Sequence, residues 1–161
     1  MDTNNYQIKL NFIEGLKDVV EKEVKLKTNH TILSQENNCF YLDFKDSLAE
    51  VLQLKSVGNV SLVTNHQNYN PGYLSKHKNI LKNILDIVLQ KSPDKFKIFK
   101  LSCAGADSDE VKNILKYIEL EYKILAQQEA DLKINIYKSK NSWEISIQVT
   151  ARPLSLRPYK C

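Results

Sequence analysis

Apolar and polar residues alternate along the first third of the chain in short runs, and each run predicts one element. Residues 6–12 (YQIKLNF) place every second side chain on an apolar face, which is typical of a half-buried strand. Residues 14–25 carry apolar residues at helical spacing, residues 31–44 predict two strands around a polar turn, residues 47–54 a short helix, and residues 59–64 another strand. The order β-α-β-β-α-β predicts a ferredoxin-like unit over residues 1–66.

In the rest of the chain the pattern predicts longer helices as well as strands. Residues 65–73 (NHQNYNPGY) are polar and contain Pro-Gly, so we expect a linker there. Beyond it the pattern predicts a helix over residues 74–90, a strand over 96–103, a second helix opening near Asp107, and two strands over 132–137 and 143–150 joined by a hairpin loop. The fold class is therefore α+β, with a second α/β unit over residues 67–161 that ends in an irregular basic tail.

The last two predicted strands have one apolar and one polar face. The polar positions are Lys133, Asn135 and Tyr137 on the first strand, and Glu144, Ser146, Gln148 and Thr150 on the second. An antiparallel sheet with one face open to water explains this pattern.

Composition restricts the classes of function without choosing one. The 161 residues carry a net charge of +4, which permits a polyanionic partner without requiring one. Three cysteines far apart, with no CxxC pair, predict free thiols in a reducing compartment. The N-terminal segment also lacks the features of a signal peptide, so we expect a cytoplasmic protein.

Catalytic and metal-binding patterns are not evident. The four glycines are too far apart for a phosphate or dinucleotide loop, and none of the three histidines has a second ligand at metal spacing. Cys103 follows a strand but has no neighbouring base in the sequence, which favours an incidental thiol over a nucleophile. We expect no catalytic residue, no metal site and no bound cofactor in this chain.

Lysines are concentrated between residues 76 and 100. This stretch contains two aspartates and seven lysines, at positions 76, 78, 82, 91, 95, 97 and 100. Two interpretations stay open: the lysines solubilise a helix surface, or they bind a polyanion.

The tail ARPLSLRPYK, residues 151–160, contains both arginines of the chain, Arg152 and Arg157, together with Lys160. Arginine binds phosphate with two parallel hydrogen bonds and stacks on bases, which lysine cannot do. Two prolines stiffen the segment and Tyr159 adds an aromatic ring. The tail therefore predicts a phosphate-binding segment.

Residues 143–160 (WEISIQVTARPLSLRPYK) resemble the end of a THUMP domain, where a last strand runs into a Pro-Leu-Ser-x-Arg-Gly-Tyr-Arg-like segment. The FKIFKLSC strand, the following helix and the DLKINIY strand are similar to the THUMP order. NFIEGLKDVVEKEV resembles the opening of the ferredoxin-like module that precedes THUMP in certain RNA methyltransferases. Two positions depart from the pattern, because Pro158 replaces the usual glycine and Lys160 the usual arginine.

The resemblance implies an RNA-binding region that presents tRNA or rRNA to a methyltransferase domain using S-adenosylmethionine. The RNA-binding residues that we expect are Lys97, Lys100, Arg152, Arg157, Tyr159 and Lys160. No Asn/Asp-Pro-Pro-Tyr motif of a catalytic domain is present, so the chain is either an N-terminal fragment or a stand-alone protein. Its end one residue past the Arg-Pro-Tyr-Lys segment leads us to expect a fragment. The alternative is a non-catalytic adaptor that docks a separate RNA-modifying subunit. Arg157 and Tyr159 could also serve only to pin the tail to the sheet.

Overall fold

The computed structural model describes residues 6–44, 48–67, 69–70, 73–91, 96–103, 109–127, 130, 132–139 and 142–150. These residues form a mixed α+β fold with an eight-stranded sheet, in the order β2-β3-β1-β4-β8-β7-β5-β6, and three α-helices. Most neighbouring strands are antiparallel, and β5 is parallel to both β6 and β7. The α+β fold class predicted from the sequence is therefore confirmed.

The first half contains β1 (Tyr6–Asn11), α1 (Lys17–Lys27), β2 (Ile32–Gln35), β3 (Cys39–Asp43) and β4 (Asn59–His66). The α-helix predicted over residues 47–54 is wrong, because the described residues there form a turn and the 3₁₀ element η2 (Val51–Gln53). Its apolar side chains are nevertheless buried, so the hydrophobic pattern was right and the type of helix was not. The exact ferredoxin-like arrangement stays a prediction.

The second half contains α2 (Leu74–Lys91), β5 (Ile98–Cys103), α3 (Asp109–Tyr122), β6 (Leu125–Ala126), β7 (Leu132–Ser139) and β8 (Ser142–Gln148). The sequence predicted all of these except β6, whose two residues are too few to show a period. The predicted start of the second helix at Asp107 lies outside the described residues.

Strands β4 and β8 join the two halves in one sheet. They pair antiparallel over six positions, from Ser61 opposite Gln148 to His66 opposite Trp143. The predicted linker begins inside β4, and Tyr69 beyond it is buried against the rings of His77 and Trp143. The proposed boundary between residues 66 and 67 thus falls at the end of a central strand.

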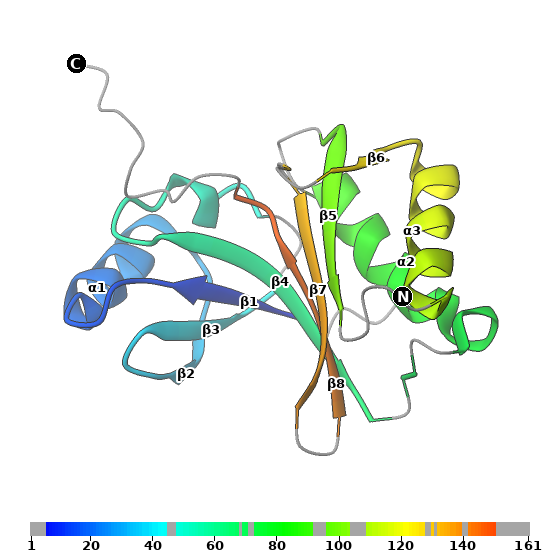
Figure 1. Cartoon of the computed structure of the whole chain (residues 1–161). Helices are drawn as coiled ribbons and strands as arrows, with labels where there is room; N and C mark the ends of the chain where they lie inside the picture. The colour runs from blue at the N-terminus through cyan, green and yellow to red at the C-terminus, as the bar shows by residue number, and fades with distance from the viewer. Residues whose placement is uncertain are drawn as a thin grey trace.

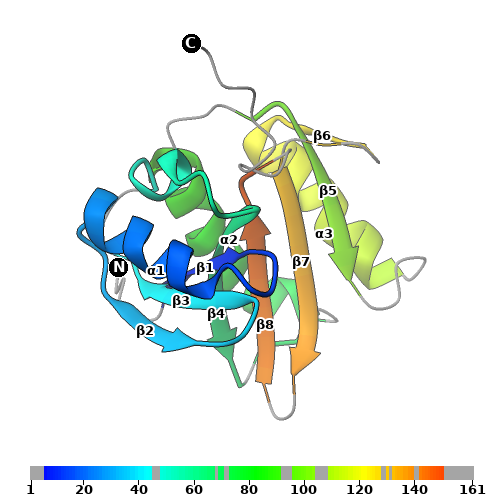
Figure 2. The ribbon, with the colours of Figure 1, turned by 90° about the vertical axis from the view of Figure 1, so that its left-hand side faces the viewer.

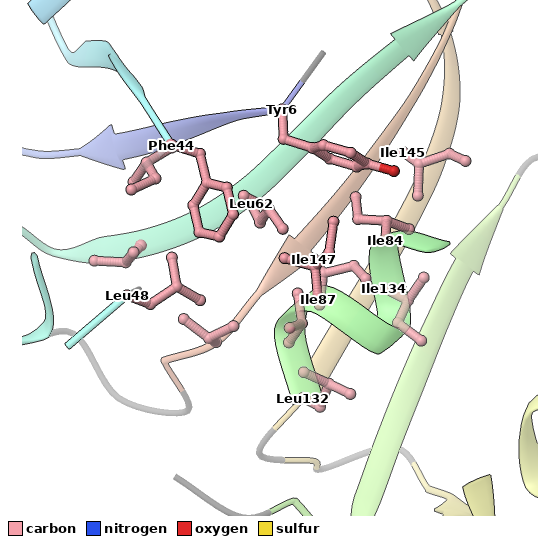
Figure 3. Packing of buried hydrophobic residues seen from close by; sticks show 14 of the residues in the cluster. Tyr6, Phe44, Leu48, Leu62, Ile84, Ile87, Leu132, Ile134, Ile145 and Ile147 are labelled. Atoms are coloured by element: carbon pink, nitrogen blue, oxygen red, sulfur yellow. The ribbon is translucent and has the colours of Figure 1, made fainter. Parts of the chain in front are cut away.

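All three helices bury their apolar stripes on the same face of the sheet. Paired strand residues share a face, and the inward set forms one hydrophobic cluster with side chains of α1, η2, α2 and α3. Figure 3 shows this cluster, in which Leu62 of β4 lies among Ile145 and Ile147 of β8 and Ile84 and Ile87 of α2. One continuous core therefore spans both halves of the chain.

The sheet twists strongly across its width. In Figure 1, β1 and β3 run across the view, whereas β7 and β8 run nearly vertically. Figure 2 shows β8, β7 and β5 side by side, with α1 lying over the first strands. None of the helices that the structure describes is long and apolar enough to span a membrane.

A half-buried carboxylate joins α1 to the segment before β4. Glu23 accepts hydrogen bonds from the backbone N–H of Lys55 at 2.8 Å, the backbone N–H of Ser56 at 2.9 Å and the Ser56 hydroxyl, and it pairs with Lys27. Burial alone would raise the pKa of the Glu23 carboxyl, but these donors outweigh burial and lower it to about 2. The carboxylate therefore stabilises the fold only while it is ionised.

Candidate nucleic-acid interface

The face of the sheet opposite the helices carries a row of polar residues across six strands. Cross-strand pairing places Tyr41, Lys9, Ser61, Gln148, Lys133 and Lys100 side by side, in that order from β3 to β5. Paired residues point to the same face, so three lysines from β1, β7 and β5 share one line of the sheet. We call this set the lysine row, and the face that carries it the open face.

The lysines of the row are half-buried, with aliphatic stems that lie along the sheet. None of the ion pairs formed by the described residues includes Lys100 or Lys133. Two neighbouring cations without an ion pair among the described residues favour a positive potential on this part of the open face. The row can therefore attract an anionic ligand.

The centre of the open face holds buried residues. Ser61 and Val63 of β4, and Glu144 and Ser146 of β8, are buried there although none of the described helices lies on this face. The prediction that Glu144, Ser146 and Thr150 lie on a wet face is therefore wrong.

Lys9, Tyr41 and Glu144 interact electrostatically on the open face. Burial raises the pKa of the Glu144 carboxyl, and the ammonium of Lys9 opposes the rise. Burial alone would lower the pKa of Lys9, but Tyr41 and Glu144 raise it above its usual range. The Lys9 Nζ lies 5.6 Å from the centroid of the Tyr41 ring. Since β4 separates β1 from β8, these side chains interact across the strand between them.

A shallow depression lies beside this centre, at the carboxyl ends of β5 and β7. It is lined by Ser102, Cys103, Asn135, Ile136 and Tyr137. Ser102 is the register partner of Asn135, Asn135 faces Ser146, and Tyr137 faces Glu144. The depression thus combines a hydroxyl, an amide and an exposed aromatic ring with a buried carboxylate next to them.

Only part of the binding set expected from the sequence can be placed. Lys100 lies in the lysine row, and Lys97 is exposed in the bend just before β5, outside the strand. Arg152, Arg157, Tyr159 and Lys160 lie outside the described residues. The sequence analysis missed Lys9 as a binding candidate, although the alternation of the first strand already placed it on the polar side.

The chain before the tail is fixed at the junction of the two halves. The Val149 N–H donates to the Val60 carbonyl at 3.0 Å, and the Val60 N–H donates to the Thr150 hydroxyl at 3.3 Å. The Gln148 amide donates to the Thr150 carbonyl at 2.8 Å. The predicted binding segment that follows therefore starts from a buried, hydrogen-bonded anchor.

The lysines of α2 lie on the helical side of the molecule. Lys82 is neutralised by Asp86 at 3.1 Å and Glu121 at 3.8 Å, whereas Lys76 lies over the exposed ring of Tyr73. Tyr122 donates to Asp86 at 2.8 Å and so joins α3 to the same network. At least one of these lysines thus contributes to helix packing, and both interpretations of the others stay open.

The described cysteines and histidines have structural environments. The buried Cys39 thiol donates to Glu36 at 2.8 Å, and burial with the Glu36 carboxylate raises its pKa to about 11. Burial also raises the pKa of Cys103, so neither thiol is activated as a nucleophile. The His30 ring bonds the Asp43 carbonyl at 2.9 Å. Within the described ranges, no three His, Cys, Asp or Glu side chains gather as metal ligands would.

Comparison with protein-family models finds no match, and no curated protein matches the chain in sequence.

Solved structures share the fold at low sequence identity. TrmN from Thermus thermophilus has a TM-score of 0.65 and 12% identity, over 94% of this chain and 48% of its own. A 4-thiouridine synthetase in complex with RNA and ATP has a TM-score of 0.54 and 12% identity, over 90% and 42%. SMU.472, described as a candidate methyltransferase and complexed with SAH, has a TM-score of 0.55 and 13% identity, over 89% and 41%. The chain spans less than half the length of each of these proteins.

Proposed function

We propose that this chain is the RNA-binding N-terminal region of an S-adenosylmethionine-dependent tRNA or rRNA methyltransferase of the THUMP family. It would position the RNA for a catalytic domain outside these 161 residues. The resemblance of residues 143–160 to a THUMP segment supports the family, and the fold shared with TrmN and with a synthetase solved in complex with RNA supports the role.

The observation that carries the proposal is the lysine row on the open face. Neighbouring strands are about 4.8 Å apart, so the four strand spacings from Lys100 to Lys9 span about 19 Å. Lys100 and Lys133 lie one strand spacing apart and Lys9 lies three spacings further, so the row can neutralise phosphates at the two ends of a short single strand, while exposed Tyr137 offers a ring on which a base can stack. The described helices all pack on the other face, and none of them lies on the open face.

The residues expected from the sequence extend this surface. Lys97 lies in the bend just before β5, and Arg152, Arg157, Tyr159 and Lys160 follow the anchor at Thr150 in the sequence. In the proposal these residues form a cationic strap between the RNA-binding region and the catalytic domain. They would position phosphates without reading bases.

The cofactor would be bound by the catalytic domain. The four glycines of this chain, at positions 15, 58, 72 and 105, do not form a glycine-rich loop. We therefore expect S-adenosylmethionine to be bound by the catalytic domain, and the part of this chain would be to bind and orient RNA.

A fluorescence titration of residues 1–161 with bulk tRNA at several salt concentrations tests the proposal. We expect the logarithm of the binding constant to fall linearly with the logarithm of salt concentration, because phosphate contacts release counterions. A binding constant that does not change with salt, or no binding at low salt, would contradict it.

The adaptor alternative predicts a different result in cells. Purification from the source cell with and without nuclease would then recover a protein subunit that resists nuclease, and no RNA. Recovery of RNA that nuclease removes is the result that the proposed function predicts.

A further inference from the structure

Glu144 is a buried charge on a face that no helix covers. The residue is 6% exposed, and its Oε2 atom has no hydrogen-bond partner. An acceptor buried without a donor is costly, and folded proteins avoid it unless a water, an ion or a ligand supplies the donor. A neutral leucine or threonine at this position would pack on the sheet without that cost. A ligand that donates hydrogen bonds would satisfy this atom.

The surroundings of Glu144 suit a flat, polar molecule. Tyr137 is its cross-strand partner on β7, and Tyr137 is 40% exposed beside the depression. Asn135 and Ser102 bring an amide and a hydroxyl to the same depression. Directly paired side chains lie roughly 5 Å apart at Cβ, so Glu144 lies next to the depression that Tyr137 lines. We call Ser102, Asn135, Tyr137 and Glu144 the acceptor pocket.

The chemistry of the acceptor pocket selects among ligands of the open face. A carboxylate repels phosphate, so this is not where the RNA backbone lies. It accepts from N–H groups, and an aromatic ring stacks on any base. On the Watson–Crick edge, guanine presents two adjacent donors, its ring N–H and its exocyclic amine, which match the two oxygens of a carboxylate. Adenine, cytosine and uracil each present a single donor group there.

We propose that the acceptor pocket binds one unpaired guanine of the RNA, stacked on Tyr137 and hydrogen-bonded through its Watson–Crick edge to Glu144. This inference rests on the proposed function, since the lysine row supplies the backbone contacts that bring the strand to the pocket. Burial raises the pKa of the Glu144 carboxyl, and the nearby ammonium of Lys9 opposes this rise and so favours the ionised, accepting form.

Short fluorescent RNAs test the inference on the chain of 161 residues. Octamers of uridine with and without one central guanosine are titrated at a fixed low salt concentration. We expect the guanosine octamer to bind at least about fivefold more tightly, in the range of one good bidentate base contact. An inosine octamer, which lacks the exocyclic amine, should bind with intermediate affinity.

Glu144→Gln separates the carboxylate from the shape of the pocket. Glutamine keeps the size of the side chain but offers one acceptor instead of two, so the ratio of guanosine to uridine affinities should fall towards one. Glu110→Gln, which removes the same charge from the exposed first turn of α3, is the matched control and should leave the ratio unchanged. The melting temperature of each variant shows that it is folded.

The outcomes separate the two proposals. If all the octamers bind equally, or if Glu144→Gln keeps the guanosine preference, the acceptor pocket holds only water and the inference is overturned, while the proposed function stands. If no octamer and no tRNA binds at low salt, the proposed function itself is contradicted. A preference for cytidine or adenosine over guanosine would also overturn the assignment to guanine.

Discussion

The two faces of the sheet bury their side chains in different ways. On the helix-covered face, Ile134 and Ile147 are fully buried among apolar neighbours from both halves of the chain. On the open face, Ser146 and Glu144 of β8 are also buried, at 6% exposed each, although none of the described helices lies on this face. The covered face thus provides stability, whereas the open face retains polar groups whose burial is useful only if they bind something.

The two faces should differ most in the free energy of unfolding that is lost when one side chain of β8 is replaced by alanine on each face. Ile147→Ala removes a fully buried side chain that faces Leu62 and Ile134, so we expect a loss of about 2–5 kcal/mol in the free energy of unfolding. Ser146→Ala, one residue earlier on the open face, should change it by less than about 1 kcal/mol. Urea denaturation measures both, and equal losses would show that the two faces pack alike.

A polar contact on the covered side should have the next largest effect. Glu23→Gln weakens the bonds to Lys55, Ser56 and Lys27, and we expect a loss of about 1–3 kcal/mol at neutral pH. Because the folded pKa is lowered to about 2, the stabilisation is present above the ordinary value of 4.5 and is lost as pH falls towards 2. Thermal unfolding of wild type and variant across this range should converge at low pH. A constant difference would contradict the account.

Glu144 should show the opposite sign. Its folded pKa is raised by burial, so ionisation opposes folding, and stability falls as pH rises through the carboxyl range towards the folded pKa. We expect Glu144→Gln to be more stable than wild type by about 1 kcal/mol at neutral pH, with the difference shrinking in acid. Melting temperatures at several pH values check this. A variant that is less stable at neutral pH would mean that the carboxylate has a partner within the fold.

Much of the fold could be predicted from the local pattern, because side chains return to the same face every two residues in a strand and every 3.6 residues in a helix. Two-residue β6 carries no period, and η2 differs from an α-helix by a hydrogen-bond shift that composition does not reveal. The pairing of β4 with β8 joins residues some eighty positions apart, and nothing local encodes it. For the same reason the lysine row and the burial of Glu144 were not predictable. They depend on register between distant strands.

The smallest effect concerns a second buried polar atom, this time on the covered side. The Tyr69 hydroxyl has no hydrogen-bond partner, so Tyr69→Phe should be neutral or stabilising by up to about 1 kcal/mol. Tyr122→Phe is the matched comparison, because its hydroxyl donates to Asp86 at 2.8 Å, and we expect it to cost about 1 kcal/mol. Chemical denaturation of both variants measures these changes in the free energy of unfolding. A larger loss at Tyr69 than at Tyr122 would contradict the assignment.

The most direct test of the proposed RNA binding asks which side of the molecule binds RNA. Lys9→Gln, Lys100→Gln and Lys133→Gln are combined to remove the lysine row, and Lys76→Gln, Lys78→Gln and Lys112→Gln are combined to remove the same charge from the exposed surfaces of α2 and α3. The salt dependence of tRNA binding is then measured for both variants and for wild type. The account predicts that the open-face variant binds more weakly and loses about two to three units of the salt slope, while the helix-surface variant keeps the wild-type slope. A helix-surface variant that loses the slope, beside an open-face variant that keeps it, would contradict the account.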